Sequence, residues 1–345
     1  MRIAVDARAL LAGRGVARYV RRLLAALAEQ FPDDDWHAFV PGRAPVEAPE
    51  GVTLHRHPFG GRAVFGAASI LGRPPIDLLC DGADVVLIPA PAPVAPGRAP
   101  YVLTIHDLSF EDRPGDFTLY ERLWHRLARP GFLAGRAARV IAVSSATAAE
   151  AARWHVEATV VLSGVDHLTH ASPPEGAPDY FLSVGALEPR KAPELLAAAH
   201  RRARSAGLKA ELWFAGEGRI AVAGDGIRTL GTPDDADLAS LYSGALALVM
   251  PSWLEGFGLP PLEAAACETP SIVSDLPVYD ETLGANVVRV ARGDEVALSG
   301  ALLRMERAPE ARAELAKAAH HAVAPLTWAR TARETHAVLV EAAAR

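Results

Sequence analysis

Short apolar runs alternate along the chain with longer segments whose hydrophobic residues recur with the period of a helix. In the first half these runs occupy residues 2–6, 36–40, 52–56, 84–88, 101–105 and 139–143. Apolar runs that alternate with helical segments are typical of parallel sheets covered by helices on both faces. The pattern therefore predicts an α/β fold for this half.

The clearest predicted helix begins near Val16, after the Gly13-Arg14-Gly15 turn that follows the first run. Its apolar positions share one face and comprise Val16, Val20, Leu23, Leu24, Leu27 and Phe31. A stripe of this period buries one side of a helix against a sheet. We therefore expect this helix to cover the first strand.

A second series of apolar runs occupies residues 180–184, 211–215, 227–230, 245–249 and 271–274. A chain of 345 residues exceeds the usual size of a single hydrophobic core. The proline-rich segment 172–178 separates the two series, and proline interrupts both helices and strands. We predict Rossmann-like domains over 1–172 and 173–326, and a terminal helix over 327–345 that packs back toward the first domain.

Composition and charge exclude several classes of protein. Hydrophobic residues make up 50% of the chain and charged residues 22%, which is ordinary for a folded protein. The net charge of −6 argues against nucleic acid as a partner. Cys80 and Cys267 are too few for a disulfide framework or a cysteine metal site. Since no leader and no apolar run of roughly 18 residues is present, we expect a cytoplasmic protein.

The most informative segment, residues 251–263, follows an apolar run. Glu255 therefore falls at the carboxyl end of a predicted strand, the edge where open α/β sheets bind ligands. Pro260 and Pro261 favour the first turn of a helix, with Glu263 just inside it. Such a helix start attracts phosphate, and carboxylates accept hydrogen bonds from sugar hydroxyls. Alternatively, Glu255 is a solvated loop residue and Glu263 complements the helix dipole.

Two further segments place polar side chains at predicted strand ends. Arg190 and Lys191 follow the first strand of the second domain, and a guanidinium fork beside a point charge suits a diphosphate. The alternative is a solvated basic turn. His106 follows the run 101–105, where it could donate a hydrogen bond to a ligand. A histidine satisfied within its own loop is the alternative there.

These segments resemble the family 4 retaining glycosyltransferases. Glu255 and Glu263 match the family's glutamate-x7-glutamate signature within an EGFGLPPLEA-type stretch. Residues 185–191 are similar to its G-x-x-E-x-R-K segment, and residues 214–218 to its glycine turn after the next strand. Two departures are visible. Ala192-Pro193 stands where the family usually has Asn, and Ser163 replaces the Asn of an N-G-V-D turn.

The resemblance implies a GT-B fold, in which two Rossmann-like parallel-sheet domains face a central cleft. It implies that Glu255 holds hydroxyls of the transferred sugar, that Glu263 binds the donor ribose, and that Arg190 and Lys191 bind the diphosphate. His106 would make a polar contact in the active site. The residues whose backbone lies against the donor would comprise Gly13, Gly15, Gly185, Gly216, Gly256, Phe257, Gly258 and Leu259.

The resemblance also implies transfer of a hexose with retention, the leaving diphosphate helping to deprotonate the acceptor hydroxyl. The segment His106-Asp107-Leu108-Ser109 resembles bacterial polysaccharide and O-antigen mannosyltransferases of the family. GDP-mannose is therefore the expected donor, with a UDP-sugar as the alternative. No Asp-x-Asp motif lies at a predicted strand end, so we expect catalysis without a metal or cofactor. Closure of the domains over the donor would exclude water.

The acceptor is expected to be a glycan, a lipid-linked sugar or a small molecule. Residues 59–75 combine apolar groups with arginines. They indicate either a peripheral contact with the inner face of the membrane or a helix packed on its own domain. Two other functions are alternatives: a nucleotide-sugar epimerase, whose acid/base residues are not evident, and a catalytically silent sugar-nucleotide-binding subunit. The presence of all the candidate site residues together disfavours the silent subunit.

Overall fold

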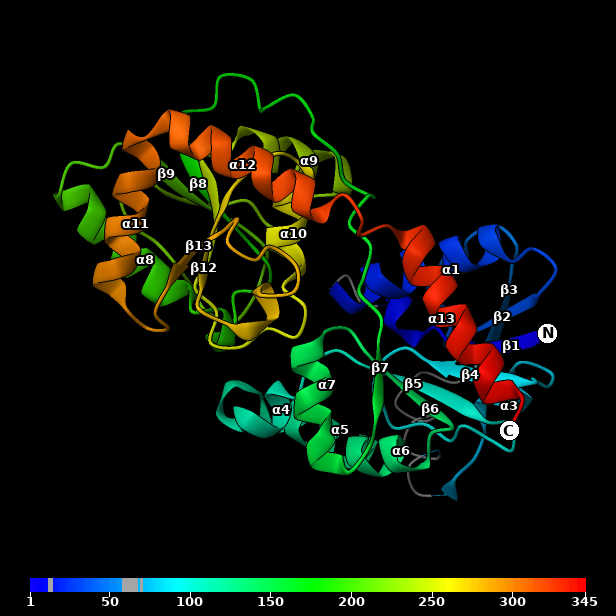
Figure 1. Ribbon diagram of the computed structural model, residues 1–345. Coiled ribbons are helices and arrows are strands. Elements are labelled where there is room, and N and C mark those ends of the chain that lie inside the picture. The colour runs from blue at the N-terminus through cyan, green and yellow to red at the C-terminus, as the bar shows by residue number, and fades with distance from the viewer. Residues whose placement is uncertain (12–14, 58–67, 69–70) are drawn as a thin grey trace. The chain divides into compact units, whose positions relative to one another are not determined.

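The computed structural model describes residues 1–11, 15–57, 68 and 71–345, which form two compact units (Figure 1). Unit 1 comprises Met1–Gly164 together with Thr327–Arg345, and unit 2 comprises Val165–Leu326. Gly13, expected to contact the donor, lies outside the described residues. So does most of segment 59–75, which the sequence interprets as either a membrane contact or a helix packed on its own domain.

The sheet of unit 1 has seven parallel strands within the described residues, in the order β3-β2-β1-β4-β5-β6-β7. They are β1 (Arg2–Asp6), β2 (Asp35–Pro41), β3 (Val52–His57), β4 (Val85–Ile88), β5 (Tyr101–Ile105), β6 (Arg139–Ala142) and β7 (Ala158–Val160). The sequence predicted the first six to within one residue at each end. It missed β7, which has only three residues and no extended apolar run. Successive strands are added on one side of β1 up to β3 and on the other side from β4 onward, so the switch point of this sheet lies between β1 and β4.

The helix α1 (Gly15–Gln30) buries the predicted apolar face, including Val20, Leu23 and Leu27, against the sheet. Phe31 lies beyond the end of α1, where its ring stacks on His336 at 3.6 Å. The other helical segments described in unit 1 are η1 (Arg8–Leu11), α3 (Ile76–Leu79), α4 (Ser109–Asp112), η2 (Pro114–Asp116), α5 (Leu119–Ala128), α6 (Pro130–Arg136), α7 (Ser145–Ala151), η3 (Ala152–Trp154) and α13 (Trp328–Ala343).

The end of the chain returns to unit 1 as α13, which packs beside α1 (Figure 1). Trp328 and Leu339 are buried in the same core as the apolar face of α1. Thr331 Oγ1 donates a hydrogen bond of 2.8 Å to the carbonyl oxygen of Leu162. A Cβ atom at Gly164 would lie 2.2 Å from the backbone nitrogen of Trp328. Only glycine therefore fits where the two segments pass, and the terminal helix is an integral part of unit 1.

The sheet of unit 2 has six parallel strands, in the order β10-β9-β8-β11-β12-β13. They are β8 (Tyr180–Val184), β9 (Glu211–Ala215), β10 (Ile227–Thr229), β11 (Ala247–Met250), β12 (Ser271–Ser274) and β13 (Val288–Val290). The sequence predicted all of these except β13, a strand of three residues interrupted by Arg289. The switch point lies between β8 and β11, the strands that precede the two most informative motifs.

The helical segments of unit 2 cover its sheet and connect its strands. They are η4 (Pro189–Lys191), α8 (Pro193–Ser205), α9 (Asp235–Gly244), α10 (Leu259–Ala266), η5 (Pro277–Tyr279), α11 (Glu295–Arg307) and α12 (Pro309–Val323). In the part of the chain that the structure describes, no helix has both the length and the apolar composition that a membrane crossing requires.

The division between the units falls at Gly164, ahead of the proline-rich segment at which the sequence placed it. The intervening residues are bonded to unit 2. His170 Nδ1 donates to the carbonyl oxygen of Cys267 at 3.2 Å, and the backbone N–H of Ala171 donates to Ser243 Oγ at 3.0 Å. These bonds join residues far apart in the sequence, so the local composition that marks a linker does not reveal them.

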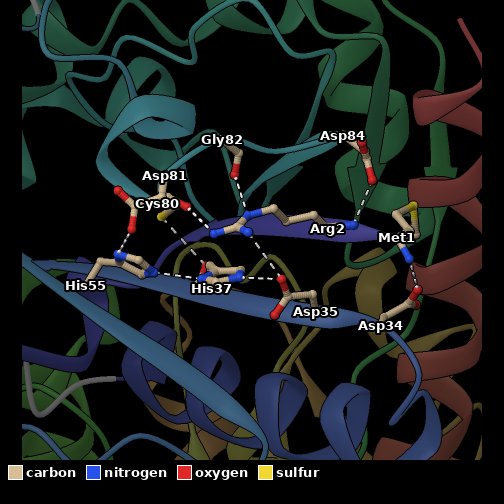
Figure 2. A network of polar contacts seen from close by, with 10 residues as sticks. All are labelled: Met1, Arg2, Asp34, Asp35, His37, His55, Cys80, Asp81, Gly82 and Asp84. Carbon is tan, nitrogen blue, oxygen red and sulfur yellow. Dashed lines mark hydrogen bonds and ion pairs between the residues drawn. The ribbon is translucent and has the colours of Figure 1, made fainter.

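Two histidines share a hydrogen bond across neighbouring strands of unit 1, as Figure 2 shows. His37 Nδ1 and His55 Nε2 are 2.7 Å apart, so one ring donates and the other accepts. His37 Nε2 lies 2.8 Å from Asp35 Oδ2, and the contact with His37 lowers the pKa of Asp35. Burial, and then the neighbouring His37, lower the pKa of His55. The shared bond requires that one of the facing nitrogens be unprotonated.

Unit 1 is accordingly predicted to lose stability as the pH falls below about 6.5, the pKa of an unperturbed histidine. The folded state holds the pKa of His55 below that value, so the unfolded chain binds more protons in this window. Each such histidine contributes a slope of up to about 1.4 kcal/mol per pH unit. Urea unfolding at pH 7.5 and 5.5 measures the effect, and His55→Gln should make it shallower. An unchanged pH dependence in His55→Gln would contradict this account.

Candidate active site

The two main motifs of unit 2 meet at the switch point of its sheet. The loop after β8 contains Arg190 and Lys191, and the loop after β11 contains Glu255. The backbone N–H of Trp253 donates a hydrogen bond of 2.9 Å to the carbonyl oxygen of Arg190. Lys191 Nζ lies 2.5 Å from Glu255 Oε1. The structure thus brings together three of the residues that the sequence selected for catalysis.

The charges of this cluster are largely withdrawn from solvent. The side chains of Lys191 and Glu255 are 13% and 7% exposed, so each charge depends on the other for compensation. The guanidinium of Arg190 forms no hydrogen bond or ion pair with any described residue. Lys191 is the cation paired with Glu255, and the adjacent Arg190 adds a second cation to the same loop, which suits an anionic group.

The glycine turn after β9 packs directly on the loop after β8. The backbone N–H of Gly185 donates to the carbonyl oxygen of Ala215 at 2.9 Å. A Cβ atom at Gly216 would lie 2.0 Å from the carbonyl oxygen of Gly185, and one at Gly218 would lie 2.3 Å from that of Leu187. Close backbone packing therefore requires the glycines at 216 and 218.

An ion pair also joins the loop after β8 to the loop after β9. Arg219 Nη2 lies 2.5 Å from Glu188 Oε2, and Arg219 Nε donates to that oxygen at 2.7 Å. The side chain of Glu188 is only 11% exposed. Sequence reasoning used Glu188 as part of a motif but missed its partner, because Arg219 lies just past the glycine turn in a different loop.

The start of α10 has fewer N–H donors than the sequence suggested. Gly258 precedes the helix with a φ of +72°, in the left-handed region that favours glycine. Pro260 and Pro261 follow Leu259 in the first turn, and neither proline has an N–H group. The helix dipole remains, but backbone donation to a phosphate falls to Leu259 and the preceding glycine turn. The neighbouring Phe257 is buried.

Tyr279, which sequence reasoning missed, packs under the glycine turn. A Cβ atom at Gly258 would lie 2.5 Å from Tyr279 Cε1. The hydroxyl of Tyr279 is buried, and no described residue hydrogen-bonds to it. Burial, and then the nearby Glu255 carboxylate, raise the pKa of Tyr279 well above its usual value. The phenol therefore stays protonated and has a hydrogen bond to donate beside Glu255. The only feature of the sequence that could have indicated Tyr279 as a site residue is its position in the loop after β12.

Glu263 is buried and already accepts two hydrogen bonds within unit 2. Tyr242 Oη donates to Glu263 Oε2 at 2.9 Å, and His167 Nε2 lies 3.2 Å from Glu263 Oε1. The side chains of His167 and Glu263 are each 1% exposed. Binding of a donor ribose by Glu263, as the family resemblance implied, would require one of these internal partners to be exchanged.

In unit 1, His106 follows β5 and donates through Nε2 to the carbonyl oxygen of Pro89 at 2.7 Å. Its ring meets Tyr19 edge-on, with ring centroids 4.8 Å apart. Burial lowers the pKa of His106, which favours the neutral ring. The proton is then on Nε2, so Nδ1 is an acceptor. This geometry differs from the expected hydrogen-bond donor and suits a hydroxyl group better than a phosphate.

The switch point of unit 1 carries a second ion pair that the sequence did not reveal. Arg8 Nε donates to Asp6 Oδ1 at 2.6 Å, just beyond the end of β1, and Asp6 is buried. A hollow of about 150 Å³ adjoins the pair and is lined by residues that include Asp6, Arg8, Pro89, Pro91 and Trp124. Ligands bind at such switch points in open α/β sheets. A Cβ atom at Gly15, by contrast, would meet no atom within 4 Å, so packing does not require that glycine.

No group of three or more His, Cys, Asp or Glu side chains in the described residues could hold a metal ion.

The fold places the chain among the GT-B proteins, which combine two Rossmann-like parallel-sheet domains. The sucrose-phosphate synthase from Thermosynechococcus elongatus superposes with a TM-score of 0.75, over 98% of this chain and 97% of that one, at 18% sequence identity. A model described as Glycosyltransferase Family 4 matches residues 13–167, and one described as Glycosyl transferases group 1 matches residues 168–322. The chain belongs to glycosyltransferase family 4.

Curated relatives match parts of the chain. The O-antigen chain mannosyltransferase RfbU of Salmonella typhimurium is 48% identical over 75 residues, which are 22% of this chain and 21% of that protein. The D-inositol 3-phosphate glycosyltransferase of Frankia alni is 32% identical over 176 residues, 45% of this chain and 43% of that protein. The chain thus spans less than half the length of these relatives.

Replacing Gly258 by alanine should destabilise unit 2 more than a left-handed backbone alone would. Gly258 and Gly176 have φ values of +72° and +68°, but a Cβ atom at Gly176 would meet nothing within 4 Å. Gly176→Ala should therefore cost about 1–2 kcal/mol for the backbone alone. Gly258→Ala should cost about 1–3 kcal/mol more because the new methyl group meets Tyr279. Urea unfolding of both variants tests this, and equal losses of stability would refute it.

Proposed function

We propose that this chain is a retaining glycosyltransferase that moves a hexose from a nucleotide-diphosphate sugar to an acceptor hydroxyl. The observation that carries the proposal is the cluster of Arg190, Lys191 and Glu255 at the β8/β11 switch point. A diphosphate needs cations and a sugar needs carboxylate acceptors, and this cluster supplies both within one site. Membership in glycosyltransferase family 4 supports the same conclusion.

In the proposed reaction the diphosphate lies against Arg190 and Lys191. The bond between the sugar C1 and the diphosphate oxygen breaks, and the acceptor oxygen bonds to C1 on the same face. The acceptor proton passes to the departing diphosphate, whose growing negative charge the two cations stabilise. Phosphate binding would draw Lys191 from Glu255, which frees the carboxylate to accept hydrogen bonds from sugar hydroxyls.

Two neutral groups complement these charges. Tyr279 can donate its unpaired hydroxyl hydrogen to a ligand oxygen beside Glu255, and such a bond would satisfy a buried polar group. His106 can accept from a hydroxyl through Nδ1. The Asp6–Arg8 hollow of unit 1, with Trp124 in its wall, is proposed to hold part of the acceptor. No metal or cofactor is required by this scheme.

The proposed donor is GDP-mannose, with a UDP-sugar as the alternative. Similarity to an O-antigen chain mannosyltransferase supports mannose, and the acceptor would then be a glycan or a glycolipid. A catalytically silent sugar-nucleotide-binding subunit is the competing function. The two differ in turnover, because a silent subunit binds the donor without releasing the nucleotide diphosphate.

The Lys191–Glu255 pair is predicted to be essential for transfer and not only for stability. Lys191→Met and Glu255→Gln should each lower kcat by about 10²–10³-fold, because each removes a group that contacts the donor. Each single variant also strands a partly buried charge, so the double variant should recover stability without recovering activity. Glu211→Gln, which breaks the Glu211–Arg228 pair at the amino end of β9, is the matched control. Full activity in the double variant would refute the assignment.

Donor identity is tested by thermal shift with GDP, UDP, ADP and dTDP and their common sugars. A ligand at a hundredfold excess over its Kd should raise the unfolding temperature by on the order of 5–10 °C. We expect GDP-mannose to give the largest shift, unchanged by a chelator. A larger shift with a UDP-sugar would replace the proposed donor. No shift with any nucleotide would overturn the proposed site.

A further inference from the structure

Unit 1 contains a second hollow, of about 440 Å³, which shares no residue with the candidate active site. Side chains from α4, α5, α6 and η3 form its walls. Arg122, Arg126 and Arg129 line it, together with a single carboxylate, that of Glu111. A volume of this size falls in the range of sites for small molecules. The hollow therefore combines room for a ligand with an excess of positive charge.

This hollow lies on the opposite side of α5 from the one proposed to hold part of the acceptor. Successive helix residues are about 100° apart, so Arg122 and Arg126 project from nearly the same face. Trp124, which lines the proposed acceptor hollow, is about 160° around the helix from each of them. The two hollows are therefore separate sites, and α5 is the wall between them.

The arginines of this hollow have no anionic partner within the described part of the chain. Arg122 Nε donates to the carbonyl oxygen of Phe117 at 3.1 Å, and the guanidinium of Arg129 lies 4.1 Å from the centre of the Phe132 ring. No described carboxylate pairs with Arg122, Arg126 or Arg129. Like charges four residues apart on a helix repel each other, and the helix dipole disfavours a cation in the first turn, where Arg122 stands. A bound anion would relieve both costs.

The one carboxylate of the hollow is engaged elsewhere. Trp154 Nε1 donates to Glu111 Oε1 at 2.9 Å, and Arg153 Nη2 lies 3.9 Å from Glu111 Oε2. Trp154 also packs closely on Gly131, where a Cβ atom would lie 3.1 Å from Trp154 Cδ1. Glu111 thus helps to hold the indole in place and does not neutralise the arginines of α5.

Aromatic rings form much of the remaining wall. Phe110 stacks on His125 with centroids 4.6 Å apart, and Phe117 meets the same imidazole edge-on at 5.4 Å. Phe132 is 49% exposed. His125 Nδ1 is buried, and no described residue hydrogen-bonds to it. Because buried polar atoms are rarely left unpaired, this nitrogen indicates a hydrogen-bonding partner from outside the chain.

We propose that this hollow binds a small organic phosphate. The phosphate would lie on the arginines, and an aromatic or other apolar group would lie on the rings of Phe110, Phe132 and Trp154. Guanidinium groups bind phosphate through paired hydrogen bonds, and an arginine stacked on a ring keeps its N–H groups available for them. Inorganic phosphate would leave the aromatic walls unused, and an uncharged molecule would leave the arginines unpaired.

The bound phosphate would be an effector and not the acceptor, because α5 separates the two hollows. A ligand held there would restrict α5, which also carries Trp124 in the wall of the proposed acceptor hollow. The proposal concerns binding alone and does not rest on the proposed transferase activity.

Isothermal titration calorimetry of the full chain with phenyl phosphate tests the proposal. Phenyl phosphate should bind, and inorganic phosphate should bind at least about tenfold more weakly because it buries no ring. Arg122→Gln/Arg126→Gln should weaken the binding of phenyl phosphate by about tenfold or more, because charge-assisted hydrogen bonds are lost. Phe132→Leu should narrow the difference between the two probes. Added salt should weaken the binding of both.

Two control variants separate this hollow from other positive sites. Arg201→Gln/Arg202→Gln removes two exposed arginines from α8 of unit 2, and Lys191→Met/Glu255→Gln removes the charged pair of the candidate active site. Both should bind phenyl phosphate as the unaltered chain does. Loss of binding in the Lys191→Met/Glu255→Gln variant would assign the phosphate to the candidate active site and overturn the proposal.

Three other results would also overturn it. They are the absence of phenyl phosphate binding to the unaltered chain, equal affinities for phenyl phosphate and inorganic phosphate, and unweakened binding by Arg122→Gln/Arg126→Gln. Both arginines are exposed, so this variant should fold. Circular dichroism and urea unfolding check that it does, and Phe132→Leu provides an independent test of the same hollow.

Discussion

The parallel pairing of β8 with β11 is the constraint on which the candidate site depends. Phe181 pairs with Ala247 and Leu182 with Leu248, so the carboxyl ends of two strands distant in sequence reach the same edge of the sheet. The sheet winds away from this pair in both directions, and the loops that follow diverge from one another. Lys191 and Glu255 meet at that point because of the pairing. No local interaction would join them.

Electrostatics explains why this place suits chemistry on an anion. Lys191 and Glu255 are held where water has limited access, so their interaction is stronger than on an open surface. The carboxylate of Glu263, by contrast, is satisfied within unit 2 by Tyr242 and His167. The two glutamates of the signature thus have different environments: one is paired with an exchangeable cation, and the other is built into the core.

Two of the glycines that the family resemblance assigns to ligand binding are also required by packing. Gly216 lies against the backbone of Gly185, and Gly258 lies against the ring of Tyr279. Glycine 164 has the same function beside Trp328, at the point where the terminal helix joins unit 1. In each case a single added carbon would collide with atoms that cannot move freely. A glycine motif therefore indicates that something packs closely against the backbone, which can be a ligand or another part of the chain.

The sequence by itself determined the order of the elements, the bounds of most strands and the loops that carry the candidate residues, because periodicity and strand ends are local properties. The tertiary structure alone decided what those residues meet. In the folded chain Arg219 pairs with Glu188, and Tyr279 packs against the glycine turn at Gly258. Long-range hydrogen bonds make residues 165–172 part of unit 2. The helix α5 shows the reason, because its Leu119 and Leu123 are exposed although both are apolar. Periodicity shows that a helix has an apolar side, but only packing decides whether that side faces the core or the solvent.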